Sequence, residues 1–319
     1  MSDHKPVLVS GVKPTGDLHI GNYFGAMRQL AELSASNKYK CFIFVANYHA
    51  LNTMQEAEEM KRRTRELVMA YLAIGLDPKE VIFFKQSDVS AHTELAWIFD
   101  TITTMPYLMR AHAFKDAEAK NKEISVGTFN YPMLMAADIL LYDATVVPVG
   151  QDQKQHIEIA RDTAEKFNRV FKTDVFKLPE PYIMSEVAVV PGTDGQKMSK
   201  SYGNVIPLFA SRDELAKAVM SIVTDSSGIR PENVYAIHTL VKSPDELAPI
   251  YAEHEGNYKK LKEMLIEDLD RYLAPMRAKY EELATNSDIV DDILAKGKKD
   301  ARAVSEAKME QVRAAIGVA

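Results

Sequence analysis

The chain has 319 residues, which exceeds the roughly 250–300 over which one hydrophobic core usually grows, so we expect two domains. Apolar residues make up 46% and charged residues 26% of the chain, a composition that excludes intrinsic disorder. The formal net charge of -6 gives no general attraction to a polyanion, so any contact with nucleic acid must be local.

The N-terminus and the cysteine content favour a cytoplasmic protein without a membrane anchor. No apolar stretch after Met1–Lys5 is long enough for a signal peptide or a membrane span. The single cysteine, Cys41, lies in the apolar run 41–45, which is typical of a core residue and excludes an internal disulfide. The eight histidines are scattered, so we expect no structural metal site.

The first half of the chain alternates short apolar runs with longer amphipathic segments. Strands are predicted at 7–9, 41–45 and 81–84, and helices from about residues 20, 56 and 93. This order predicts βαβ units, and hence an α/β fold with a doubly wound parallel sheet covered by helices on both faces.

The first predicted helix combines a buried face with a polar opening turn. Its apolar residues Ile20, Phe24, Met27 and Ala31 follow a helical spacing, which predicts that the helix packs on the sheet. Its N-terminus would then lie at the carboxyl edge of the first strand, where open α/β sheets bind ligands.

The segment 14–22 between the first strand and this helix is the first candidate site. A helix start offers unpaired N–H groups and the positive end of the helix dipole, both of which suit phosphate. Gly16 and Gly21 permit close approach of the backbone, and His19 and Asn22 present polar side chains from one face of the turn. A helix cap with a solvent-exposed histidine is the alternative interpretation.

Helical signals dominate after about residue 206. Capping boxes begin at Ser211 and Ser243, and the second has proline at the first helical position. Asn257 is a candidate N-cap for a helix that extends to 284 and that Pro275 should break or kink. A last helix is expected to end near Gly317.

The segment 197–201, Lys-Met-Ser-Lys-Ser, is the second candidate site. Glycines at 192, 195 and 203 surround it, which is typical of a mobile loop, here with two ammonium groups. Alone, such a loop is usually solvated surface. Together with His19–Asn22 it resembles the two signatures of class I aminoacyl-tRNA synthetases. The resemblance implies that the first signature contacts ATP and that the lysines stabilise the pyrophosphate leaving group.

The segments 131–142 and 147–153 resemble the amino-acid-binding helix and the following strand of tryptophanyl-tRNA synthetases. Asp138 is the one charged residue in the first of them. A buried carboxylate without a partner is costly, so Asp138 should be exposed, be capped locally or await a donor. The indole N–H is such a donor. A capping or salt-bridged aspartate is the alternative interpretation.

The resemblance implies a set of site residues. Catalytic roles fall to His19, Asn22, Lys197 and Lys200. The residues expected to contact ATP are Lys13, Pro14, Thr15, Gly21, Asn22, Gly150, Gln151, Asp152, Val187, Lys197, Met198, Ser199, Lys200 and Ser201. The residues expected to contact tryptophan are Val9, His49, Tyr131, Met135, Asp138, Val147, Val149 and Gln153. For His49, a satisfied core histidine is an equally good interpretation.

Two of these positions favour tryptophan over tyrosine. Tyrosyl-tRNA synthetases share the fold and both signatures, but they typically carry a glutamine and a tyrosine that serve the substrate phenol. Here those positions are Met135 and Val9, which offer no amide or hydroxyl. A site for the tyrosine phenol that lacked an amide and a hydroxyl at these positions would lose hydrogen bonds, and such bonds can give about 10⁴–10⁵-fold selectivity against the wrong amino acid. Val9, Lys13 and Gln151 depart from the commonest bacterial tryptophan pattern, in which an aromatic, a glutamine and a glutamate stand there.

The same resemblance implies a function and its partners. The chain would be a tryptophan–tRNA ligase that forms tryptophanyl-adenylate from ATP, with Mg²⁺ held mainly by the phosphates, and transfers tryptophan to tRNA(Trp). A Rossmann-type catalytic domain would span 1–206, with a helical insert near 90–130 that forms a homodimer. The basic stretch 110–115 would face the acceptor stem, and a helical domain at 207–319 would read the anticodon, its last helix packing back on the catalytic domain.

Two other classes of protein stay open. A small-molecule adenylyltransferase would need neither the lysine loop nor the helical C-terminal region. A non-catalytic paralogue that senses an amino acid or binds RNA would have no use for both signatures.

Overall fold

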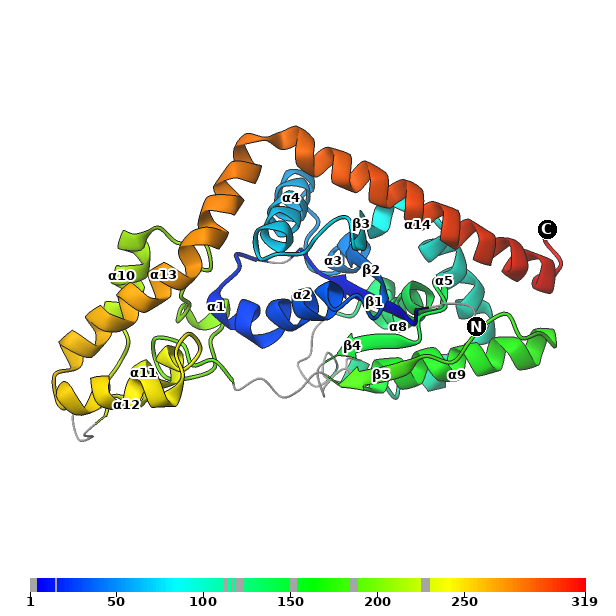
Figure 1. Cartoon of the computed structure of the whole chain (residues 1–319). Helices are drawn as coiled ribbons and strands as arrows, with labels where there is room; N and C mark the ends of the chain where they lie inside the picture. Colours follow the sequence, from blue (N-terminus) through cyan, green and yellow to red (C-terminus); the bar gives the residue numbers. More distant parts are fainter. Residues whose placement is uncertain are drawn as a thin grey trace.

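The strands of the chain form one parallel sheet. A computed structural model describes residues 5–14, 16–111, 114–115, 118, 123–149, 154–183, 189–224 and 230–319. Its sheet has five strands in the order β3-β2-β1-β4-β5 (Figure 1). Their bounds are β1 Val7–Val12, β2 Lys40–Val45, β3 Val81–Lys85, β4 Val146–Val149 and β5 Glu180–Ile183. The chain moves outward from β1 to β3 and then returns to the other side of β1, which creates a topological switch point between β1 and β4.

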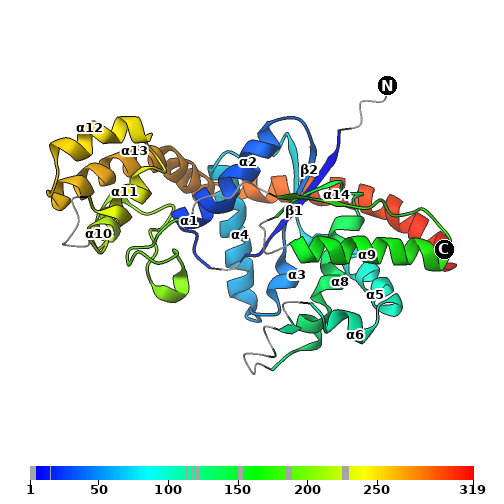
Figure 2. The same ribbon diagram turned by 90° about the horizontal axis from the view of Figure 1, so that it is seen from below.

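The helices fall into two groups. Those interleaved with the strands are α1 Ile20–Asn22, α2 Arg28–Ala35, α3 Asn47–Ala50, α4 Ala57–Ala73, α5 Ala91–Ile102, α6 Met105–Leu108, α8 Val126–Leu140 and α9 Lys154–Phe171. Those that follow are α10 Arg212–Met220, α11 Glu232–His238, α12 Pro244–Glu253, α13 Tyr258–Thr285 and α14 Ser287–Ile316. In two perpendicular views α10 to α13 gather at the end of the molecule opposite α9 (Figures 1 and 2). The predicted doubly wound α/β class is confirmed.

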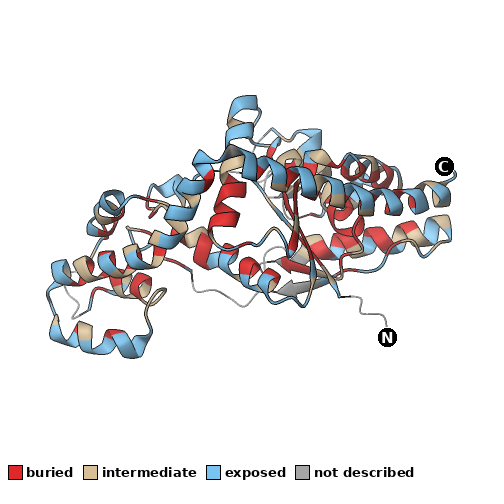
Figure 3. Ribbon diagram, turned by 45° about the horizontal axis from the view of Figure 1, so that its top comes forward, coloured by how far each residue is buried: buried red, intermediate tan, exposed pale blue. Residues whose placement is uncertain are grey.

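The two faces of the sheet are buried in different clusters. Leu8 and Ile43 belong to a cluster with α2 and α4 that continues into α10, α11 and α13. Val9 and Phe42, their neighbours along the strands, belong to a cluster with α5, α8 and α9. Successive strand residues point to opposite faces, so both faces carry apolar side chains, as helices on both sides require. Figure 3 shows the corresponding pattern, with buried strands and helices exposed along their outer faces.

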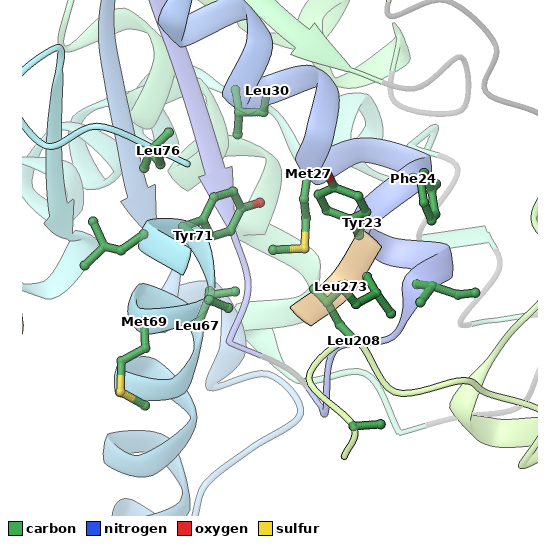
Figure 4. Packing of buried hydrophobic residues seen from close by; sticks show 14 of the residues in the cluster. Tyr23, Phe24, Met27, Leu30, Leu67, Met69, Tyr71, Leu76, Leu208 and Leu273 are labelled. Atoms are coloured by element: carbon green, nitrogen blue, oxygen red, sulfur yellow. The ribbon is translucent and has the colours of Figure 1, made fainter. Parts of the chain in front are cut away.

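The first helix packs as its sequence predicts. Ile20, Phe24, Met27 and Ala31 are all buried. Between α1 and α2, however, the residues Tyr23–Met27 form a π-helical turn, which the periodicity did not predict. Figure 4 shows Tyr23 and Met27 directed toward the side chains of α4, among them Tyr71. The Tyr23 hydroxyl also lies 3.1 Å from the Tyr272 hydroxyl of α13, so this turn connects the sheet to the C-terminal helices.

The helix starts of the C-terminal half are confirmed, and of the break or kink expected at Pro275 the structure excludes the break. Ser211 and Ser243 form capping boxes, and the Asn257 side chain accepts the Lys260 N–H. Helix α13 continues through Pro275, although a proline removes one helical hydrogen bond. Buried leucines on both sides, such as Leu273 and Leu283, hold the helix in place, so tertiary packing outweighs the local penalty.

Helix α14 returns to the sheet and packs across the edge strand β3 (Figure 1). It ends at Gly317, which adopts a left-handed conformation with φ 80°. Arg313 near its end donates two hydrogen bonds of 2.8 Å to the Glu94 carboxylate of α5. An edge strand is a template for unwanted pairing, and α14 covers it. Within the described ranges, none of the helices has the length and hydropathy to cross a bilayer.

Gly297 is the point at which α14 touches the strand, and its replacement should be costly. A Cβ atom there would lie 1.8 Å from the carbonyl oxygen of Phe83, so the helix would have to move away from β3. We expect Gly297→Ala to destabilise the protein by about 1–3 kcal/mol, seen as a lower Tm in thermal unfolding. Gly25→Ala is the matched control, because no atom lies within 4 Å of a Cβ at that helical glycine. Equal Tm values for the two variants would contradict the close contact.

Candidate functional site

A cleft of about 1090 Å³ opens at the carboxyl edge of the sheet, next to the switch point between β1 and β4. It is lined by β1, the first helix, α8 and the lysine-containing segment. Most of the predicted site residues that the structure describes lie in its wall. They are Val9, Lys13, His19, Gly21, Asn22, His49, Tyr131, Met135, Asp138, Val147, Lys197, Met198 and Ser199.

The other predicted site residues are placed differently. Pro14 lines a neighbouring cavity of about 280 Å³, and Lys200 forms an ion pair outside the cleft wall. The Ser201 hydroxyl lies 2.8 Å from that of Ser199. Val149 ends β4, but its side chain is outside the described part of the structure. The structure does not describe Thr15, Gly150, Gln151, Asp152, Gln153 and Val187.

His19 is held inside the cleft at the start of the first helix. Its backbone N–H donates to Asn22 Oδ1 at 3.1 Å, and the next residue, Ile20, donates to the Ile206 carbonyl. The imidazole is buried, which contradicts the interpretation of an exposed cap. Its Nδ1 has no hydrogen-bond partner among the described residues, although it lies in the cleft wall. A buried polar atom of this kind is suited to a ligand.

Gly21 permits the close approach between the first helix and the lysine segment. A Cβ atom at Gly21 would lie 2.9 Å from His19 Nδ1 and 3.2 Å from Met198 Cβ. Met198 is itself buried, and its N–H donates to the Val190 carbonyl at 3.0 Å. The two segments that the sequence identified as separate signatures therefore pack against each other at the mouth of the cleft.

The lysine segment is fixed by Asn204, which the sequence analysis did not identify. The buried Asn204 accepts the Ser199 N–H at 2.8 Å and donates to the Lys197 carbonyl and to Asp194. A Cβ at Gly192 would collide with it. The glycines around this segment thus allow close packing here, as well as the turn at Gly195, where φ is 84°.

Lys200 is paired with Asp17. Its Nζ lies 2.9 Å from Asp17 Oδ2, and Asp17 also accepts a hydrogen bond from Arg63. The Arg63 hydrogen bond and the nearby Lys200 hold the pKa of the Asp17 carboxyl below its usual value. Partial burial lowers the pKa of Lys200, and Asp17 opposes that shift. Because Asp17 is largely exposed, this ion pair is weak enough for an anionic ligand to replace it.

Asp138 is buried and has three side-chain partners, which fits the alternative interpretation of a salt-bridged aspartate and excludes an exposed one. Asp138 Oδ2 lies 2.8 Å from His49 Nε2. Asp138 Oδ1 lies 2.7 Å from Gln86 Nε2 and 2.6 Å from His92 Nδ1. Burial alone would raise the pKa of Asp138, but the two histidines outweigh it and hold the pKa below its usual value. Asp138 therefore stays ionised, and one acceptor position on it is left for a ligand in the cleft.

Gln86 and His92 were missed by the sequence analysis. Gln86 directly follows β3, and a polar residue at the carboxyl end of a buried strand was a signal that could have found it. His92 lies in the first turn of α5 and gave no such signal. His156 was also missed as a site residue; its Nε2 lies 3.1 Å from the Tyr131 hydroxyl in the cleft wall.

Comparisons with known proteins agree with this arrangement. Residues 1–288 match the model of the family tRNA synthetases class I (W and Y). A tryptophan–tRNA ligase of Fusobacterium nucleatum is 45% identical over 318 residues, which is 97% of either chain. The crystal structure of tryptophanyl-tRNA synthetase from Campylobacter jejuni with ADP and tryptophan has a TM-score of 0.91 and 42% identity, over 97% of this chain and 99% of that one. The synthetase of Mycoplasma pneumoniae has a TM-score of 0.81 and 29% identity, over 99% and 98%.

The protonation of His19 can be tested directly. Burial lowers the pKa of His19 below 6.5, and the charge of Lys200 lowers it further. In an NMR titration of the imidazole nitrogens, we expect Lys200→Met to move the His19 pKa upward without restoring the ordinary value, because burial persists. Lys197→Met is the matched control and should leave the titration of His19 unchanged, since Lys197 is not a cause of the shift.

The same shift predicts a pH dependence of stability. In the unfolded chain His19 binds its proton at a higher pH than in the folded protein. The free energy of unfolding should therefore decrease as the pH falls below about 6.5, the pKa of His19 in the unfolded chain. A folded pKa at or above that value in the wild-type protein would contradict the burial argument.

Proposed function

The chain belongs to the class I tRNA synthetases of the tryptophan and tyrosine family, and from this premise we propose how it acts as a tryptophan–tRNA ligase. It activates L-tryptophan with ATP and transfers it to tRNA(Trp). The single observation that carries the assignment is a buried, ionised carboxylate, Asp138, in the wall of a cleft that also contains both nucleotide signatures.

The tryptophan end of the cleft is apolar apart from a few polar groups. Val9, Phe44 and Val147 are buried and line it together with Met135. These side chains offer a substrate phenol no amide or hydroxyl, and Asp138 accepts a hydrogen bond from the indole N–H. We assign Tyr131 and Gln153 to the substrate amino group. His49 lies beside Asp138 and lines the same cleft.

The nucleotide end of the cleft is formed by the first helix and the lysine segment. His19, with its unpartnered Nδ1, and Asn22 are placed to contact ATP, and Gly21 permits close approach of the backbone. Lys13 and Lys197 line the cleft, and Lys200 lies next to Gly16 in the segment that follows β1. Burial lowers the pKa of Lys13, so its charge is poorly solvated and well suited to a phosphate. We assign Gly150, Gln151, Asp152 and Val187 to the nucleotide as well.

The reaction proceeds in two steps. A carboxylate oxygen of tryptophan attacks the α-phosphorus of ATP, and the bond to the bridging oxygen breaks, so pyrophosphate leaves with the electron pair. The 2′-hydroxyl of the terminal adenosine of tRNA then attacks the acyl carbon, AMP leaves, and the hydroxyl proton passes to phosphate or water. The protein supplies alignment and charge stabilisation: Lys197 and Lys200 stabilise negative charge that develops on the leaving phosphoryl oxygens.

Mg²⁺ is expected to arrive with the nucleotide. Among the described residues no group of three or more histidine, cysteine, aspartate or glutamate side chains could hold a metal ion. Mg²⁺ is commonly held by substrate phosphates and water, and it neutralises phosphate charge there.

We propose that two further regions serve tRNA and dimer formation. Apolar side chains around the insert 90–130 are unusually exposed, among them Trp97 at 70%, Met105 at 66% and Val126 at 75%. A second copy of the chain would cover them in a symmetric homodimer.

Arg110 in this insert would face the acceptor stem, and the helical domain at 207–319 would read the anticodon by contacts to unpaired bases. The ligase is expected to work in the cytoplasm.

The assignment is tested by amino-acid-dependent ATP–pyrophosphate exchange. The protein should exchange label in the presence of L-tryptophan and Mg²⁺, and tyrosine should be a far poorer substrate because Val9 and Met135 offer the phenol no partner. A panel of the other amino acids provides the control. Exchange that tyrosine supports better than tryptophan would overturn the specificity, and exchange with no amino acid would overturn the activity.

Lys200 is tested by single-turnover formation of the adenylate. Lys200→Ala should slow this step by about 10²-fold or more while tryptophan affinity stays close to that of the wild type, because the lysine acts on charge that forms in the transition state. Lys299→Ala, which changes an exposed lysine of α14 that does not line the cleft, is the control. A normal rate for Lys200→Ala would remove this lysine from the mechanism.

A further inference from the structure

The two oxygens of Asp138 have different surroundings. Oδ1 receives hydrogen bonds from Gln86 and His92, whereas Oδ2 receives one from His49. Gln86 and His92 do not line the cleft, but His49 and Asp138 do. A carboxylate has about four acceptor positions, so the hydrogen bonds from behind the cleft wall saturate Oδ1. The acceptor position that is left belongs to Oδ2, on the side of the cleft.

Gln86 can face Asp138 in only one orientation. Its side chain is fully buried, and its Oε1 accepts the backbone N–H of Tyr48 at 3.1 Å and that of His49 at 3.4 Å. An N–H group cannot pair with an amide NH₂, so the rotation that exchanges oxygen and nitrogen is excluded. The Gln86 amide must therefore donate to Asp138, and the start of α3 fixes that donor.

His92 is fixed in the same way from another element. The ring is fully buried, with Nδ1 at 2.6 Å from Asp138 and Nε2 at 2.9 Å from the Tyr142 hydroxyl. An ionised carboxylate only accepts, so Nδ1 carries a proton and donates it to Asp138, while Nε2 pairs with the Tyr142 hydroxyl. Burial and the charge of Asp138 raise the pKa of Tyr142, which keeps its hydroxyl protonated. Tyr142 follows α8, the helix that carries Asp138, so the chain of hydrogen bonds closes on itself.

We propose that Gln86 and His92 are positioning residues that hold the Asp138 carboxylate with Oδ2 toward the indole N–H and thereby set the selectivity for tryptophan. Rotation of the carboxylate would have to break two buried hydrogen bonds, which is costly. The acceptor is consequently oriented before the substrate binds, and a substrate that lacks the N–H leaves it unpaired. This inference rests on the proposed function and adds the residues that orient its specificity group.

The test compares tryptophan with its benzothiophene analogue, in which sulfur replaces the indole N–H. In ATP–pyrophosphate exchange, the ratio of the two kcat/KM values reports the hydrogen bond to Asp138 and cancels general damage to the fold. We expect Gln86→Met and His92→Leu each to lower this ratio by about 3–10-fold, mainly through the KM for tryptophan, with the KM for ATP little changed. His92→Asn keeps an amide donor near the position of Nδ1 and should restore much of the ratio.

The chain offers a matched control in His238. This buried histidine of α11 also bridges a tyrosine hydroxyl, of Tyr251, and a carboxylate, of Asp268, but none of the three residues lines the cleft. His238→Leu should leave the ratio at its wild-type value. In an Asp138→Asn background, His92→Leu should produce no further loss, because the two residues act through one hydrogen bond.

The outcomes separate this inference from the function on which it rests. If the wild-type protein shows no tryptophan-dependent exchange, the function itself fails. If the wild type prefers tryptophan to its analogue and the Gln86 and His92 variants lose activity equally with both, the two residues are structural only and the inference is overturned.

Discussion

The satisfaction of one buried charge governs the arrangement of this site. Asp138 is only 3% exposed, and an ionised carboxylate removed from water to that degree is tolerated only when hydrogen bonds replace its hydration. Its three partners come from three different places: His49 from α3, Gln86 from the end of β3, and His92 from α5. These elements must all be in place before the carboxylate is stable, so the fold and the specificity group depend on each other. The three side chains occupy three acceptor positions of the Asp138 carboxylate, and the acceptor position that remains is the one available to the indole N–H.

Close backbone approach determines the rest of the architecture. At Gly21 the first helix meets the lysine segment, where a Cβ atom would lie 3.2 Å from Met198 Cβ, and at Gly297 the last helix meets the edge strand β3, where there is no room for a Cβ atom. The first contact places His19 beside Met198 at the mouth of the cleft. The second joins α14, and through α13 the C-terminal helices, to the strand whose end carries Gln86. The nucleotide and amino-acid ends of the cleft are thus built on one connected framework.

The sequence predicted local features well and long-range partners poorly. Apolar periodicity predicted the positions of β1, β2 and β3 and the buried face of the first helix. Most of the site residues that the motifs predicted, and that the structure describes, lie in the cleft wall, because these signals lie within short segments. The partners of Asp138 could not be predicted in this way, since they meet it only after the sheet and α5 have assembled. The continuity of α13 through Pro275 could not be predicted for a similar reason. It depends on the tertiary packing of buried leucines, which outweighs the local cost of a proline inside a helix. Asp17 was part of the first signature, but its pairing with Lys200 joins segments far apart in the chain.

The most direct test of this account is a crystal structure of the protein with L-tryptophan bound. The account predicts that the indole nitrogen lies about 3 Å from Asp138 Oδ2, within hydrogen-bond distance, while Gln86 and His92 keep their hydrogen bonds to Oδ1. An indole nitrogen directed away from Asp138, or a carboxylate that has lost its hydrogen bonds to Gln86 and His92, would contradict it.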